Sequence, residues 1–303
     1  GTCTGFVSNR IIRDVEFDYV IVDEAAKATF PELAVSLNKA HKIILVGDHQ
    51  QLPPVLDTEI IRNNKEKLDE EGLAQGIFER MYNMFPEDNK HRLTIQYRMH
   101  PTIGTLISHV FYNDEIQNGV EAQDRELCIE GYEGIAIEWI STSKYSIKER
   151  YEKEFDNNGK KSYQNYLERN IIERKLLELD SKLVKRTKVA VITGYGSQKY
   201  ILQTMVKQHS FKHIEVDVDT VDAFQGSQKD IILYSTVRSS GNKYGIGFLK
   251  SEARINVAFS RARCLLIIVG DMKFLDNYKI RGNKFPEIIK YITESEGCRI
   301  IEK

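Results

Sequence analysis

The sequence lacks three features that would each point to a particular class of protein. Its four cysteines, Cys3, Cys128, Cys264 and Cys298, do not form the close pairs that bind structural zinc. No apolar run approaches the roughly 20 residues that a membrane-spanning helix needs. No basic segment followed by an apolar one opens the chain. We therefore expect an intracellular protein with reduced cysteines and no membrane partner.

An excess of charge is missing as well. The formal net charge is -1, although 29% of the 303 residues are charged. Because nucleic acids and nucleotides bind to local surfaces, this balance excludes neither kind of ligand. A hydrophobic content of 41% over 303 residues suffices for two cores of ordinary size. The chain starts at Gly1, so we expect a longer gene product with possible further domains.

Short apolar runs that end in an acidic residue are typical of buried parallel strands. Residues 18–23 and 42–48 are two such runs, and the helical spacing of residues 31–40 lies between them. Later runs cover residues 189–193, 230–235 and 265–271, and a strong helical pattern covers 166–183. In open α/β folds, ligands bind where such strands end. We therefore predict two α/β units in tandem, residues 1–90 and 91–303.

The stretch from 141 to 161 turns polar, and we expect a surface loop there.

Asp23 and Glu24 directly follow the first predicted strand. A nucleotide hydrolase needs such a pair, because one carboxylate holds the Mg²⁺ shell and its neighbour orients and deprotonates the attacking water. The same pair could instead cap the following helix. The second strand ends in residues 47–55, where Gln51 precedes two prolines; a glutamine there can sense a γ-phosphate, or the segment can be a plain polar turn.

Later segments carry arginines and a polar loop. Arg98 and Arg261 could stabilise charge on a transferring phosphoryl group, although a lone arginine is ordinarily a solvated or ion-paired group. Tyr97 taken alone reads as a packed aromatic residue. The loop from 220 to 230 leads into a buried strand, and its hydroxyls and backbone amides could hold nucleic-acid phosphates without reading sequence.

The order of these segments is more specific than any one of them. The five segments are Asp23–Ala26, Gly47–Pro54, Gln96–Pro101, Val221–Gly226 and Asn256–Arg263. In this order they resemble motifs II to VI of superfamily 1 helicases. Smaller matches resemble the branch that contains the nonsense-mediated-decay helicase, senataxin and the immunoglobulin-switch-region binding helicase. These matches are Phe111-Tyr112, Gln117–Val120 and Ser162-Tyr163 with Asn165 and Glu168.

The resemblance implies an α/β fold of two RecA-like parallel-sheet domains in tandem, the first incomplete at its N-terminus. Such domains clamp ATP and Mg²⁺ and move along single-stranded DNA or RNA, mostly 5′ to 3′, unwinding duplexes. By likeness, Asp23 would bind Mg²⁺ through water, Glu24 would be the general base and Gln51 the γ-phosphate sensor. Arg98 and Arg261 would be arginine fingers, and Tyr97 would lie against the adenine.

For nucleic-acid binding, the resemblance assigns Gln225 and Gly226 to the loop that links the nucleotide to the single-stranded nucleic acid. It makes Thr220 a contact of a nucleic-acid phosphate. Thr193 and Tyr195 fall at further strand-contacting positions. Two positions depart from the pattern: Gln228 replaces a glutamate that touches the ribose, and Gly194 replaces a proline. Glutamine can keep a ribose hydrogen bond, whereas glycine loosens the turn that proline would stiffen.

The sequence has no Gly-x-x-x-x-Gly-Lys-Ser/Thr segment, the Walker A segment that holds the phosphates of ATP. We therefore expect this chain alone neither to hydrolyse ATP nor to unwind duplexes. The alternative is a non-catalytic helicase-like module that binds nucleic acid or protein. The five polar positions Asp23, Glu24, Gln51, Arg98 and Arg261 weigh against it, since a pure scaffold would not need them together.

Overall fold

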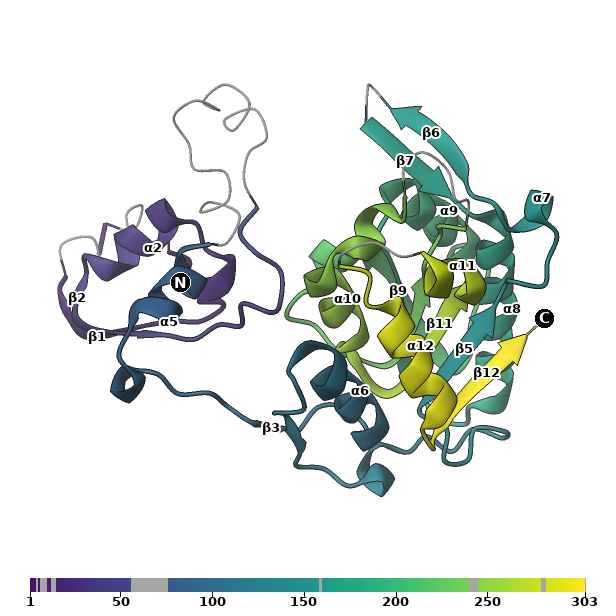
Figure 1. The fold of residues 1–303 in the computed structure, drawn as a ribbon, viewed down its shortest axis with the longest axis horizontal. Helices are drawn as coiled ribbons and strands as arrows, with labels where there is room; N and C mark the ends of the chain where they lie inside the picture. Colours follow the sequence, from purple (N-terminus) through teal and green to yellow (C-terminus); the bar gives the residue numbers. More distant parts are fainter. Residues whose placement is uncertain are drawn as a thin grey trace. The chain divides into compact units, whose positions relative to one another are not determined.

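A computed structural model describes residues 1–3, 5, 10–11, 15–55, 76–157, 160–239, 245–278 and 282–302. The chain divides into two compact units, Gly1–Arg92 and Leu93–Lys303. Figure 1 shows both units, with labels on many of their helices and strands.

The first unit is built on two parallel strands, β1 (Phe17–Val22) and β2 (Ala40–Leu45), which are joined through α2 (Phe30–Leu37). Its other elements are η1 (Ala25–Lys27), α5 (Ile77–Met84) and η2 (Glu87–Asn89). Helix α2 begins at a capping box, in which the Thr29 N–H and hydroxyl each donate to Glu32 Oε2 at 2.8 Å. These two bonds lower the pKa of Glu32, so the N-terminus of α2 is well anchored.

The two strands and their crossover helix confirm the sequence prediction, but the expected full burial of the strands is wrong. Val20 and Val22 point into a small core with Leu33 and Phe78. Tyr19 and Ile21, which alternate with them, are 56% and 66% exposed. Alternating residues face opposite sides of a strand, and in the described residues only one side of β1 is covered.

The second unit contains a six-stranded sheet in which every neighbouring pair is parallel. In spatial order its strands are β12 (Cys298–Glu302), β5 (Ile137–Ser141), β11 (Ala262–Gly270), β10 (Lys229–Ser235), β8 (Thr187–Thr193) and β9 (Ile214–Thr220). The strands predicted at 189–193, 230–235 and 265–271 lie at its buried centre. Their continuous apolar runs are therefore confirmed as interior parallel strands.

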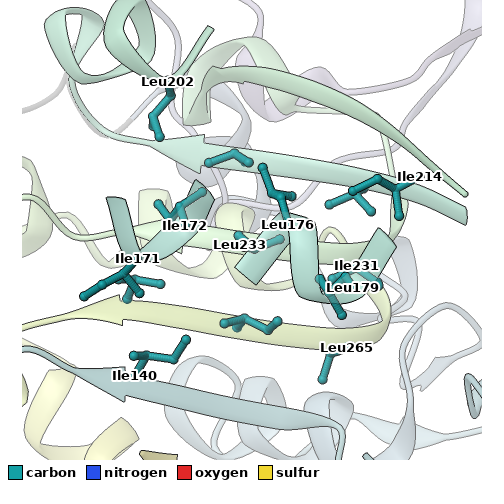
Figure 2. Packing of buried hydrophobic residues seen from close by; sticks show 14 of the residues in the cluster. Ile140, Ile171, Ile172, Leu176, Leu179, Leu202, Ile214, Ile231, Leu233 and Leu265 are labelled. Atoms are coloured by element: carbon teal, nitrogen blue, oxygen red, sulfur yellow. The ribbon is translucent and has the colours of Figure 1, made fainter. Parts of the chain in front are cut away.

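Helices cover both faces of this sheet, as adjacent residues of β5 show. Ile140 packs into the core cluster under α8 (Tyr166–Lys182) and α9 (Gly196–Val206), which also holds Leu176 and Leu233 (Figure 2). Trp139 instead meets the Phe285 ring of α12 (Phe285–Glu294) edge-on, with 6.0 Å between centroids. Further helices are α6 (Pro101–Phe111), α10 (Glu252–Phe259) and α11 (Met272–Asn277), with η3 (Ala122–Arg125), η4 (Val221–Phe224) and η5 (Gly247–Lys250). The unit is an α/β fold of sheet between helix layers.

The polar stretch 141–161 is not the surface loop that its composition suggested. It contains the short helix α7 (Ile147–Arg150) and the antiparallel hairpin of β6 (Lys153–Asn157) and β7 (Lys160–Gln164). The hairpin is anchored by Tyr163, which is buried against Tyr195 and Val237. A single aromatic anchor among many charges was too weak a signal for the composition to show it. A further two-stranded sheet pairs β3 (Ile95–Gln96) with β4 (Gln117–Asn118).

Candidate nucleotide and nucleic-acid site

Asp23 and Glu24 form the turn that follows β1, and both side chains are exposed. Glu24 has a left-handed backbone with φ 55°, and its N–H donates to Asp23 Oδ1 at 2.9 Å. A left-handed non-glycine residue costs on the order of 1 kcal/mol, and neighbouring contacts sustain it. Directly after it, the Ala25 N–H donates to Val46 O at 2.8 Å. The turn therefore presents two adjacent carboxylates in a fixed backbone conformation.

The loop after β2 lies directly beside this turn. A Cβ on Gly47 would come within 2.8 Å of the Ala26 backbone nitrogen, so only glycine fits there. Asp48 organises the rest of the loop, because it accepts hydrogen bonds from the Gln50 N–H at 2.9 Å and from Gln51 Nε2 at 2.8 Å. The γ-phosphate sensor predicted at Gln51 is thus held by Asp48. Asp48 and Gly47 lie in the motif segment Gly47–Pro54, but the resemblance assigns a role only to Gln51 there.

The donor set at this edge suits a magnesium ion that keeps most of its water. Among the described residues, no group of three or more histidine, cysteine, aspartate or glutamate side chains could hold a metal ion by itself. Mg²⁺ in nucleotide sites is typically bound through one or two carboxylates together with waters and substrate phosphates. The exposed Asp23 fits that kind of site.

In the second unit, Gln96 shapes the segment that carries Tyr97 and Arg98. Its side-chain oxygen accepts from the Arg98 and Met99 N–H groups at 2.8 and 2.7 Å, and its amide donates to Asn118 Oδ1 at 2.8 Å. Arg98 in turn donates to Ser260 O at 3.2 Å. The predicted finger is therefore fixed at its backbone and directed at the end of α10.

Tyr97 is 64% exposed, and its ring lies close against Gly119. A Cβ on Gly119 would clash with the Tyr97 ring, so any side chain there would displace the ring. Arg125 supports the same segment by donating to Tyr97 O and Arg98 O, both at 2.8 Å. Gln96, Asn118 and Gly119 lie in segments that match the family, but the match assigns them no role, and Arg125 lies outside those segments.

Arg261 is buried, with 2% of its surface exposed. It donates to Val257 O at 3.0 Å, to Ser227 O at 3.3 Å and to Ser260 Oγ at 3.1 Å. Since Arg98 also reaches Ser260, the structure brings both predicted fingers together around that residue. Arg261 therefore ties α10 to the loop after η4.

The loop from 221 to 228 runs between two ends of the sheet. Thr220 pairs with Thr193 across β9 and β8, so both lie at the carboxyl edge. At the other end of the loop, Lys229 pairs with Ala262 at the amino edge, next to Arg261. Gly226 has a φ of 79°, which only glycine adopts without strain. Gln225 is partly buried, and Gln228 is exposed.

Thr193 and Tyr195 are the predicted strand-contacting residues whose side chains the structure covers. Thr193 is fully buried, and Tyr195 is 2% exposed. The Tyr195 ring lies edge-on between Tyr163 and Phe248 at 5.4 and 5.3 Å, and burial raises its pKa to about 12. Neither side chain is therefore accessible to a nucleic-acid strand. The groups near them that could contact such a strand are the backbone at Gly194 and the half-exposed ring of Phe248.

The four cysteines are unpaired thiols, as expected. Within the described ranges, no helix is both long enough and apolar enough to span a membrane.

Known relatives match nearly the whole chain. It is 36% identical to the regulator of nonsense transcripts 1 homologue of Drosophila melanogaster, over 90% of this chain and 22% of that protein. It is 35% identical to the ATP-dependent helicase NAM7 of Saccharomyces cerevisiae, over 99% of this chain and 29% of that protein. An uncharacterised ATP-dependent helicase of Methanocaldococcus jannaschii is 31% identical over 97% of this chain and 42% of its own length. The chain thus spans less than half the length of these relatives.

Solved structures give a weaker likeness. A helicase of PRRSV aligns with 83% of this chain at a TM-score of 0.39 and 17% identity, and the alignment covers 34% of the helicase. An arterivirus nonstructural protein 10 (helicase) in complex with DNA aligns with 85% of this chain and 40% of its own, at a TM-score of 0.39 and 14% identity. Both scores are too low to support a statement about the fold.

Two family models, each described as an AAA domain, match residues 1–59 and residues 73–273. The second match covers more than half of the chain. Together with the sequence relatives, these matches confirm the resemblance drawn from the five motifs. The chain belongs to the superfamily 1 helicases, in the branch of the nonsense-mediated-decay helicase.

Proposed function

We propose that this chain is the C-terminal part of the motor core of an ATP-dependent helicase that moves 5′ to 3′ along single-stranded nucleic acid and unwinds duplexes. One observation supports the proposal above all. The strained turn of Asp23 and Glu24 lies beside a loop in which Asp48 holds the Gln51 amide at 2.8 Å. Carboxylates and an oriented amide at one sheet edge are what hydrolysis of a phosphoanhydride needs. On this proposal the first unit is an incomplete RecA-like domain.

Each of these residues would have a separate task in the first unit. Mg²⁺, when bound with ATP, neutralises charge on the β- and γ-phosphates. Asp23 would hold that ion through water. Glu24 would orient the attacking water and accept its proton, which an exposed and backbone-fixed carboxylate can do. Gln51, kept in place by Asp48, would hydrogen-bond the γ-phosphate and report its loss.

The second unit would supply the remaining contacts. Tyr97 would lie against the adenine, and Gln228 would contact the ribose. Arg98 and Arg261 would stabilise charge on the transferring phosphoryl group. Thr220, Gln225 and Gly226 would meet backbone phosphates of a single strand, together with the backbone around Thr193 and Tyr195. Backbone contacts of this kind serve DNA and RNA alike.

The test uses a polypeptide that carries this chain together with a Walker A segment, such as the complete gene product. We expect ATP hydrolysis that rises with single-stranded oligonucleotide and is abolished by Glu24→Gln. Glu16→Gln changes an exposed glutamate ahead of β1 and serves as the matched control. Hydrolysis that persists in Glu24→Gln at the wild-type rate would refute the role of Glu24.

Two further results distinguish the alternative, a non-catalytic binding module, from the proposed motor. If the complete gene product binds single strands but hydrolyses no ATP, the chain belongs to a binding module. For this chain alone we propose no hydrolysis, because its sequence has no Walker A segment. A clear strand-stimulated rate from this chain alone, lost in Glu24→Gln, would overturn that part of the proposal.

A further inference from the structure

A carboxyl group without solvent contact lies at the point where β10 ends. Glu168, in the first turn of α8, is fully buried. Its carboxyl oxygens are within hydrogen-bond distance of Ser235 Oγ at 2.6 Å, Thr236 Oγ1 at 3.1 Å and the Val237 N–H at 2.9 Å. One side chain therefore binds three consecutive residues of the segment that leaves β10. None of the catalytic or strand-binding roles described above uses it.

The backbone that Glu168 holds is strained. Val237 has a φ of 68°, and a β-branched residue in the left-handed region is a genuine outlier. Its N–H donates to Glu168, and its carbonyl accepts from Asn165 Nδ2 at 3.0 Å. Both polar groups of the strained peptide are thus fixed by the start of α8. Strain of this kind persists only where surrounding contacts determine the conformation.

Gln198 connects this cluster to the first turn of α9. Its amide donates to Ser235 Oγ at 3.1 Å and to Asn165 O at 3.2 Å, and its oxygen accepts from the Asn165 N–H at 2.8 Å. Strand β8 ends at Thr193, and Tyr195 is the N-cap residue of α9. Contact with single-stranded nucleic acid is proposed at these residues. The exit of β10 therefore cannot move without disturbing the start of α9.

The residue after the strained Val237, Arg238, connects the segment to the residues that precede α10. Arg238 is buried, pairs with Glu152 at 2.9 Å, lies over the Tyr163 ring at 4.1 Å and donates to Gly245 O at 2.7 Å. Gly245 precedes η5 and then α10, at whose end Arg261 lies. The Phe248 N–H of η5 also donates to Tyr195 Oη at 3.4 Å.

We propose that Glu168, supported by Asn165 and Gln198, is a positioning residue. It couples the binding of a single nucleic-acid strand at the start of α9 to the position of α10 and of Arg261, which follows that helix. The proposal rests on the proposed function for what the two ends do. The coupling element is the Ser235–Arg238 segment, whose strained conformation these three side chains hold. Contact with a strand at Gly194 would act on α9, and Gln198 would pass that displacement to the segment.

A glutamine should be able to replace Glu168. Burial raises the pKa of Glu168 to about 8, which leaves the carboxyl group protonated at neutral pH. The oxygen of a glutamine can accept from Ser235 and Val237, and its amide can donate to Thr236 Oγ1. Alanine can do neither. Glu168→Gln is therefore the conservative variant, and Glu168→Ala is the disruptive one.

Glu138 offers a matched control in the same unit. It is fully buried too, and it accepts from Tyr132 Oη at 2.8 Å and from Arg299 Nε at 2.9 Å, on β5 and away from the exit of β10. Glu138→Ala removes a buried carboxylate of the same size. We expect it to lower stability without changing the coupling between strand and hydrolysis.

The functional experiment measures ATP hydrolysis with and without saturating single-stranded oligonucleotide, in the Walker A-containing protein and below its unfolding temperature. We expect Glu168→Ala to lower the stimulation ratio by about fivefold or more, in the range of typical coupling energies. Glu168→Gln and Glu138→Ala should keep the wild-type ratio. An unchanged ratio in folded Glu168→Ala, or an equal fall in Glu138→Ala, would overturn the proposal.

A second measurement on this chain is independent of hydrolysis. Amide hydrogen exchange of the segment 235–239 and of α10 should speed up in Glu168→Ala and return to the wild-type rate in Glu168→Gln. If α10 is unaffected in Glu168→Ala, the link to Arg261 is refuted. If the wild-type protein shows no strand-stimulated hydrolysis, the proposed function fails, while the exchange data still decide whether Glu168 holds α10.

Discussion

Glu168 should make the stability of the second unit fall as the pH rises. Its pKa is raised from 4.5 to about 8, first because burial removes the charged form from water. The native state then keeps a proton that the unfolded state releases. By linkage, the stabilisation is fully present below the unfolded pKa and is lost between about pH 4.5 and about pH 8. Glu168→Gln removes this titration altogether.

The size of the effect follows from the shift. One pKa unit corresponds to about 1.4 kcal/mol, so a shift from 4.5 to about 8 gives roughly 5 kcal/mol as an upper limit. Inside that window, the free energy of unfolding of the wild type should fall by about 1.4 kcal/mol per pH unit relative to Glu168→Gln. All other titrating groups are shared by the two proteins and cancel in the comparison.

The sequence contains a single tryptophan, Trp139, which is buried in β5 and therefore reports on the second unit. Urea unfolding followed by its fluorescence at about pH 5.5, 6.5 and 7.5 measures the difference directly. We expect the stability of Glu168→Gln to gain on the wild type at each step. A difference that is constant with pH would show that Glu168 titrates near its ordinary value, and would refute the argument from burial.

Three further predictions concern the proposed nucleotide site and its supports. Gly119→Ala should displace the Tyr97 ring, with which a Cβ would clash, and raise the KM for ATP by about two- to tenfold; an unchanged KM would show that Tyr97 does not contact the adenine. Asp48→Ala should release the Gln51 amide and slow hydrolysis by about tenfold at saturating ATP, whereas Asp18→Ala at the exposed start of β1 should not; equal rates in the two variants would contradict a held sensor. Thr29→Ala should remove the cap of α2 and cost about 1 kcal/mol, which is measurable as faster amide exchange in that helix; unchanged exchange would mean that the cap is dispensable.

Strands β8, β10 and β11 of the second unit were predictable because each contains a continuous apolar run and is buried on both faces. The same reasoning overestimated the burial of β1 and β2, since Ile21 and Ile44 have apolar side chains but are 66% and 47% exposed. An apolar run reports what a side chain prefers. It does not report which face of a short sheet a helix covers.

The candidate site residues could be named from motif order, whereas the side chains that hold them in place could not. Asp48 and Gln96 bond groups two or three residues along the chain, through turn conformations that a motif match does not show. Arg125 donates to the carbonyls of Tyr97 and Arg98, which only the fold brings near. The same limit applies to Arg261 and Tyr195, whose burial depends on packing between distant segments. Composition likewise concealed the β6–β7 hairpin, because its anchor Tyr163 meets partners far along the chain.

On the proposed function, Glu24 and Arg98 both serve the hydrolysis of one ATP molecule. Single-turnover hydrolysis in the Walker A-containing protein tests it with Glu24→Gln, Arg98→Ala and the double variant. Residues that serve one transition state lose their effects non-additively. We predict that each single variant slows hydrolysis by about a thousandfold and that the double variant is no slower than the slower single one. Hydrolysis at the wild-type rate in Arg98→Ala, or a fully additive loss in the double variant, would contradict the account.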